Sequence, residues 1–134
     1  MSAERRSATL ESTTTIASMS TAAPTDYSVA FVTTPDSQVA TNLARRLVEA
    51  KLVACVNIIP GLTSIYAWEG KVNEDPEVLM MLKTRTERIA EVTRFVRENH
   101  PYSVAEVIAL PIADGNASYL EWIGKTVPGT PGAK

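Results

Sequence analysis

Cysteine is almost absent from this chain of 134 residues, and the single one, Cys55, excludes an intramolecular disulfide and fits a reducing compartment. No apolar run approaches the roughly 20 residues that a membrane-spanning helix requires. Basic charge is not in excess either, since 13 Lys and Arg stand against 15 Asp and Glu, and this balance gives no electrostatic footprint for nucleic acid. We therefore expect a cytoplasmic protein that neither inserts into a membrane nor binds nucleic acid.

Catalytic motifs are missing as well. No nucleophile accompanies the only histidine, His100, at a recognisable spacing. The sequence also contains neither a Walker loop nor a Gly-x-Gly-x-x-Gly loop, the two glycine-rich motifs that cradle phosphates. We expect that the protein is not an enzyme.

The two ends of the chain differ in composition from its middle. Eleven of the first 25 residues are Ser or Thr and none is aromatic, so residues 1–25 are predicted to form a disordered tail. This tail lacks the apolar core of a secretory signal, organelle targeting stays open, and Met19 is an alternative start. Residues 126–134 hold two Pro and two Gly and are predicted to be a flexible C-terminal tail, which leaves 26–125 as the folded domain.

The folded region opens with a strand and a helix. Residues Tyr27–Thr33 are rich in β-branched and aromatic side chains and predict a strand. Thr34 and Pro35 then suit the N-cap and the first position of a helix. The apolar residues that follow recur at helical spacing, namely Val39, Ala40, Leu43, Ala44, Leu47 and Val48.

Two unusually long β-rich segments follow. Val53–Ile59 and Leu62–Trp68 flank a Pro60-Gly61 break, and Glu69-Gly70 predicts a turn into a further strand, Lys71–Thr84. Because proline cannot donate to a strand ladder, Pro60 and Pro76 predict bulges or edge positions.

A hairpin of this length exceeds what two helices of about 15 residues can cover at about 1.5 Å per residue. An exposed edge of that kind invites aggregation unless another chain covers it. The sequence therefore predicts that the protein associates with copies of itself.

The remaining elements complete the fold. Ile89–Val96 predicts an amphipathic helix that ends before His100-Pro101, Val104–Ile112 predicts a strand, and Ala117–Lys125 predicts a short final helix. The order β-α-β-β-α-β is that of the ferredoxin-like α+β fold, with an antiparallel sheet and both main helices on one face. Here the fold carries an extended hairpin and the extra C-terminal helix.

Several segments, at specific spacings, resemble the CutA family of divalent-cation tolerance proteins, and more closely its animal-type members. They include Leu-Val-Ala-Cys-Val-Asn-Ile-Ile-Pro-Gly at 52–61, Thr-Ser-Ile-Tyr at 63–66, Trp-Glu-Gly-Lys at 68–71, His-Pro-Tyr at 100–102 and Glu-Val-Ile-Ala-Leu-Pro at 106–111. The resemblance implies a tight homotrimer, built by edge pairing of the long hairpins.

The resemblance also implies candidate metal ligands. In some bacterial members the suggested copper ligands are a cysteine near the end of the first strand and a pair of histidines. Here those positions are Val32 and Asn99-His100, so only His100 is retained. His100 and Glu106 are therefore the candidate site for copper or another divalent cation, completed by symmetry-related copies. The alternative is a histidine that only ends a helix.

A second candidate site combines aromatic and polar side chains. Its residues are Tyr66, Trp68, Lys83, Tyr102 and Trp122. Such side chains suit an intersubunit cleft that binds a small ligand, although Tyr and Trp are also enriched in plain interfaces. Cys55 lies between apolar neighbours and is expected to pack as a small hydrophobe.

Three functional hypotheses follow. The first is a homotrimeric divalent-cation tolerance protein of the metal-ion response, with copper as the candidate ligand. The second is a small-molecule sensor, by analogy with the trimeric PII signalling proteins, which share the protomer architecture. The third is a non-catalytic scaffold that anchors a partner enzyme, because animal-type members of the family are associated with acetylcholinesterase.

Overall fold

The computed structural model describes residues 25–130. The predicted tail 1–25 lies outside these residues apart from Thr25, and so does the end of the predicted tail 126–134. The elements are, in chain order, β1 Tyr27–Thr34, α3 Ser37–Glu49, β2 Cys55–Trp68, β3 Lys71–Arg85, the short 3-10 helix η1 Thr86–Arg88, α4 Ile89–Asn99, β4 Ile108–Pro111 and α5 Ala117–Thr126.

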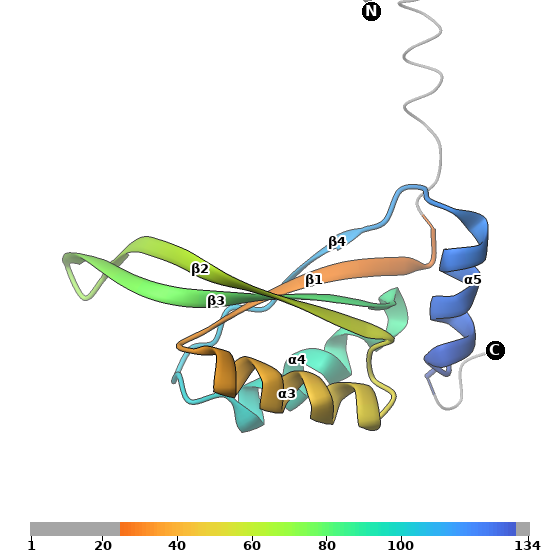
Figure 1. Cartoon of the computed structure of the whole chain (residues 1–134), viewed down its shortest axis with the longest axis horizontal. Helices are drawn as coiled ribbons and strands as arrows, with labels where there is room; N and C mark the ends of the chain where they lie inside the picture. The colour runs from red at the N-terminus through yellow and green to blue at the C-terminus, as the bar shows by residue number, and fades with distance from the viewer. Residues whose placement is uncertain (1–24, 131–134) are drawn as a thin grey trace, which may run out of the picture.

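The four strands form one antiparallel sheet in the order β2-β3-β1-β4. Helices α3 and α4 lie against the same face of this sheet, and α5 lies at the end remote from the hairpin tip (Figure 1). The prediction of a ferredoxin-like α+β fold is thereby confirmed. No helix within residues 25–130 has the length and apolar character to cross a membrane.

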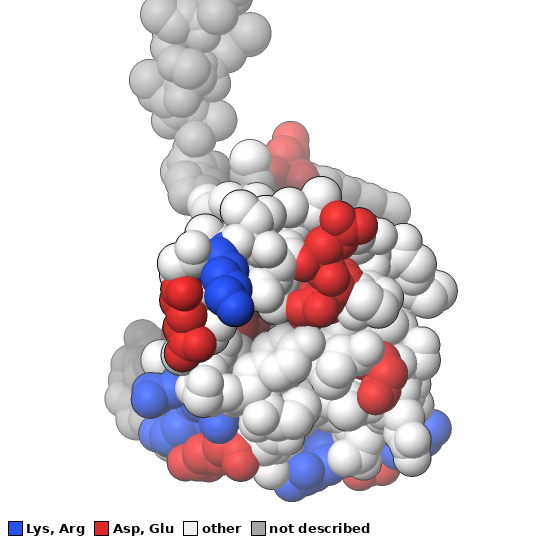
Figure 2. Space-filling model, turned by 90° about the vertical axis from the view of Figure 1, so that its left-hand side faces the viewer, with Lys and Arg blue, Asp and Glu red and all other residues white. Residues whose placement is uncertain are grey.

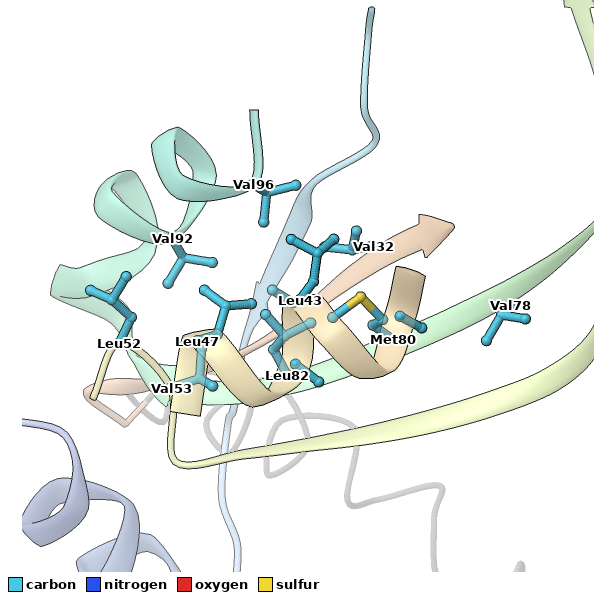
Figure 3. Packing of buried hydrophobic residues seen from close by; sticks show 13 residues of the cluster. Val32, Leu43, Leu47, Leu52, Val53, Val78, Met80, Leu82, Val92 and Val96 are labelled. Carbon is cyan, nitrogen blue, oxygen red and sulfur yellow. The ribbon is translucent and has the colours of Figure 1, made fainter. Parts of the chain in front are cut away.

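The main core fills the space between the sheet and its two helices (Figure 3). Alternate residues of β1 and β3 point toward the helices, and every third or fourth residue of each helix points back. The result is a set of fully or almost fully buried side chains: Val32, Met80 and Leu82 from the strands, and Leu43, Leu47, Val92 and Val96 from the helices. Val32, the residue that the family resemblance set beside a bacterial cysteine, is therefore a core residue.

Helix α3 begins later than the sequence predicts. Asp36 is the N-cap, and its Oδ1 accepts a hydrogen bond of 2.8 Å from the Val39 amide. The predicted N-cap, Thr34, is instead the last residue of β1, where it pairs with Val78 and donates its hydroxyl to the Val78 carbonyl. Strand pairing therefore holds Thr34 extended, and the capping position moves to the next suitable side chain.

The long hairpin of β2 and β3 has the predicted irregularities. Its register shifts between Ile59 and Leu62, where Gly61 adopts a φ of +84°, so the predicted bulge at this break is confirmed. Pro76 sits opposite Thr63 without a shift, but β1 ends opposite Val78, so β3 has a neighbouring strand on only one side there. Pro76 is thus an edge position, and its missing N–H interrupts no ladder.

The C-terminal segment is packed further than the sequence predicts. Val127 is fully buried beside Ile123, in a second small cluster under α5. Arg85 donates to the carbonyls of Gly124 and Val127, and Arg88 donates to the carbonyl of Pro128 over 2.7 Å. The folded domain therefore extends past residue 126, because two guanidinium groups on and just after β3 bind the carbonyls that end the last helix.

Leu47 offers a test of the main core. Its side chain is fully buried between α3 and the sheet, so Leu47→Ala removes buried methyl groups and leaves a cavity. We expect the free energy of unfolding to fall by about 2–5 kcal/mol, measured by urea denaturation at fixed protein concentration. Val48→Ala, at the exposed neighbouring position, is the control and should change stability by about 0.5 kcal/mol or less.

Candidate functional site

An open cleft lies between the distal part of the hairpin and the segment that links α4 to β4. Its volume is about 560 Å³, within the usual range for small-molecule sites. Strands β2 and β3 supply one wall, and residues 102–106 supply the other. The lining side chains are Thr33, Ser64, Ile65, Tyr66, Trp68, Glu77, Tyr102, Ser103, Val104 and Glu106.

Strand alternation accounts for most of the hairpin wall, with Ile65 as the exception. Ser64, Tyr66 and Trp68 share one face of β2, because successive residues of a strand point to opposite faces. The residues opposite them on β3 are Asp75, Asn73 and Lys71, so Asp75 lies beside Ser64 on this face. Glu77 follows two residues after Asp75 and points the same way.

Two tyrosines bind two carboxylates in and beside the cleft. The Tyr102 hydroxyl donates to Glu77 Oε2 over 2.6 Å, and the Tyr66 hydroxyl donates to Asp75. Burial, and then the bond to Glu77, raise the pKa of Tyr102 far above its usual value, while the bond to Asp75 raises the pKa of Tyr66. Both phenols therefore stay neutral donors throughout the physiological pH range.

His100 anchors the second wall of the cleft. It is the C-cap of α4 and is buried, with its Nε2 at 2.8 Å from the Thr33 carbonyl. Its Nδ1 accepts a hydrogen bond of 3.1 Å from the Tyr102 amide, and the His100 and Tyr102 rings lie 4.7 Å apart. These partners assign the ring proton to Nε2, because an acceptor nitrogen carries no proton. His100 thus holds Tyr102 against Glu77.

The structure brings together four of the residues singled out from the sequence. Tyr66, Trp68, Tyr102 and Glu106 all line the cleft. Lys83 does not, because it pairs with Cys55 near the other end of the sheet and donates to Asn57. Trp122 does not either, because it lies on α5 with its ring 5.4 Å from that of Tyr119.

The predicted metal pair is not assembled as a ligand set within one copy of the chain. Both ring nitrogens of His100 are engaged, so neither has a lone pair for a cation in this conformation. Glu106 lies in the cleft, but the part of the chain that the structure describes contains no group of three or more His, Cys, Asp or Glu placed to hold a metal ion. The physical reason is that the fold uses the imidazole to fix the α4–β4 connection.

Asp75 and Glu77 are the carboxylates in and beside the cleft that the sequence did not single out. Their two-residue spacing on a strand places both carboxylates on one face, and this signal was available in the sequence. What the sequence does not reveal is that this face meets Tyr102, which lies 25 residues away along the chain from Glu77.

Residues 28–126 match the sequence profile of the family described as CutA1 divalent ion tolerance protein. The chain belongs to the CutA1 family. It is similar to a CutA homolog of Xenopus laevis, with 56% identity over 101 residues that cover 75% of this chain and 67% of the relative. It is similar to CutA of Homo sapiens, with 56% identity over 100 residues, 75% of this chain and 56% of the relative.

A solved structure of CutA1 from Oryza sativa superposes on this protein with a TM-score of 0.77 and 44% identity, covering 80% of this chain and 98% of the other. The prediction of the CutA family is thus confirmed, with animal members among the relatives. The chain spans little more than half the length of the human relative. The CutA1 match includes the hairpin, His100 and the whole cleft.

The pairing of Tyr102 with Glu77 predicts a pH dependence of stability. The pKa of Tyr102 is raised in the folded state, so its contribution to stability is complete below about pH 10, the pKa of an unfolded tyrosine, and is lost as the pH rises above it. We expect the free energy of unfolding to decline less steeply above that pH in Tyr102→Phe than in the unaltered protein. Urea denaturation across this alkaline range is the measurement, and identical slopes would contradict the assignment.

Proposed function

We propose that the protein acts as a non-catalytic homotrimer in the cellular response to divalent cations. Membership of the CutA1 divalent ion tolerance family supports the physiological role. The observation that supports assembly is an apolar sheet face that the chain's own helices leave uncovered.

This uncovered face lies opposite α3 and α4. Strand register places Val29 and Phe31 of β1 beside Leu110 and Ile108 of β4, and Leu79 and Met81 of β3 continue the same face. Ile108 and Leu110 are each 56% exposed, and α5 covers only the Tyr27 end of the face. A contiguous apolar surface of this kind is typical of an interface with another chain and supports the proposed assembly.

The two free edges of the sheet indicate how copies join. Strands β2 and β4 are the edges, so pairing β2 of one copy with β4 of the next uses two different surfaces. Such a heterologous contact continues indefinitely unless it closes into a ring. A ring of three is the closed form that the family resemblance implies, and it would cover both the overhanging hairpin and the apolar face.

Light scattering combined with size-exclusion chromatography tests the trimer. We expect a mass three times that of the 14.5 kDa chain. Leu110→Glu places a charge on the apolar face and should shift the mass toward that of one copy, because a buried unpaired charge costs several kcal/mol. Val48→Glu, on the helical side of the protein, is the matched control and should remain trimeric. A stable monomer of the unaltered protein would refute the assembly.

Copper is the cation to test first. We propose that its ligands are residues other than His100. Both His100 nitrogens are engaged within the chain, so a copper site would combine donors from more than one copy. We expect His100→Gln to lower thermal stability while changing the copper dissociation constant less than about threefold, a difference under 1 kcal/mol. Isothermal titration is the measurement. Loss of copper binding in a variant that remains folded and trimeric would show that the imidazole is a ligand.

A small-molecule sensor is the second candidate function, and the cleft supports it. The cleft has the volume and the mixed aromatic and polar lining of a ligand site. The scaffold role, with a partner such as acetylcholinesterase, stays a prediction that co-purification would test. We propose the cytoplasm as the compartment, since Cys55 is a free thiol.

A further inference from the structure

We infer that the cleft beside Tyr102 and Glu77 binds a small organic cation, an alkylammonium group on a short apolar stem. The inference rests on the small-molecule candidate above and requires no metal. The residues that line this cleft all belong to a single copy of the chain.

The first step is the charge of the cleft. Its lining includes the carboxylates of Glu77 and Glu106, with Asp75 bonded to the lining residue Tyr66, and it includes no Lys or Arg. Within residues 25–130 the ion pairs are Arg85 with Glu87 and Arg88 with Glu91, so none of the three cleft carboxylates has a cationic partner there. The hairpin end of the molecule shows its largest acidic patch on the upper part, with a basic side chain among the acidic ones there, and side chains of both signs along the lower edge (Figure 2).

The second step is the burial of Glu77. This side chain is only 8% exposed, yet its one hydrogen bond in the described part of the chain comes from the neutral Tyr102 hydroxyl. A buried carboxylate is normally paired with a cation or with several donors, because removing its charge from water is expensive. Glu77 lines the cleft, so the cation that would complete its pairing can approach from there.

The third step is the hydrogen-bonding character of the two tyrosines. Both phenolic protons are already donated to carboxylates, so toward the cleft these hydroxyls offer only acceptor lone pairs. A ligand that complements such groups must itself donate hydrogen bonds. An ammonium group provides three N–H donors together with the positive charge that the carboxylates lack.

The fourth step separates an organic cation from a metal ion. The aromatic rings of Tyr66, Trp68 and Tyr102 border the cleft, and their faces attract organic cations. Ile65 and Val104 add apolar surface that would contact a hydrocarbon stem but offers nothing to a metal ion. No cluster of three metal-binding side chains occurs among residues 25–130, whereas a volume of about 560 Å³ suits an organic ligand.

Isothermal titration of the intact protein with pentylamine and cadaverine tests the inference. Pentanol and pentanoate have stems of the same length but are neutral and anionic, so we expect binding of the amines alone. Trp68 gives a second readout through its fluorescence, recorded in Trp122→Phe so that the tryptophan on the remote α5 does not contribute. Salt should weaken binding, because exposed charges are screened.

Two carboxylate variants locate the site. Glu77→Gln preserves shape and an acceptor for Tyr102, and it should weaken amine binding by about tenfold or more, the factor expected from losing one hydrogen bond to a charged group. Glu121→Gln, on the exposed surface of α5, removes the same charge far from the cleft and should leave the affinity unchanged.

Gly-Lys-Gly with an acetylated N-terminus and an amidated C-terminus, whose only ammonium group is that of the lysine side chain, distinguishes the sources of the ammonium group. Tighter binding of the free amines would identify a metabolite, and tighter binding of the tripeptide would identify a lysine side chain, with the same chemistry in the cleft. Absence of amine and tripeptide binding, or equal affinity in Glu77→Gln, would overturn the inference. Binding of pentanoate alone would also overturn the inference but would leave a small-molecule role intact. Mn²⁺ binding that depends on Glu77, in the absence of amine binding, would overturn it too and would make the cleft a metal site.

Discussion

The length of the β2–β3 hairpin is the constraint on which the rest of the structure depends. Its proximal half lies over α3 and α4, where Met80 and Leu82 complete the core. Its distal half passes beyond both helices and has no layer of its own chain beneath it (Figure 1). That free half has two effects. Its apolar residues require cover by another chain, and its polar face lies beside the α4–β4 connection, where the two form the cleft. The proposed interface and the cleft are therefore consequences of the same excess length.

His100 illustrates how a residue can shape a site through the contacts that position its neighbours. The imidazole ties the end of β1 to the α4–β4 connection through Thr33 and Tyr102. Tyr102 then provides the only hydrogen bond that the buried Glu77 carboxylate receives within the described chain. A chain of directional contacts thus runs from the sheet to the cleft, and in this geometry neither ring nitrogen of His100 has a free lone pair for a metal.

Sequence patterns predicted the parts of this structure that depend on local periodicity. The β-rich composition of Leu62–Trp68 predicted the strand that carries Tyr66 and Trp68, and these two candidate ligand-binding residues do share the cleft. Lys83 belongs to the same hairpin but pairs with Cys55, at the end of the hairpin remote from Tyr66 and Trp68. Residue composition alone does not show how far apart two residues lie along a strand. The sequence could not predict where Trp122 lies or that the His100 nitrogens are engaged, because each depends on a contact between segments far apart in the chain. For Trp122 this contact is the docking of α5, and for His100 it is the hydrogen bond to the Thr33 carbonyl.

The clamp formed by Arg85 and Arg88 has a practical consequence for handling the protein. Their guanidinium groups hold the carbonyls of Gly124, Val127 and Pro128, so a truncation before Pro128 would leave charged donors unsatisfied and open the small cluster around Ile123. Fluorophores, purification tags or surface tethers are therefore best joined after Thr130. That attachment point lies at the α5 end of the molecule, opposite the hairpin tip (Figure 1), so an attached group would stand away from the distal half of the hairpin.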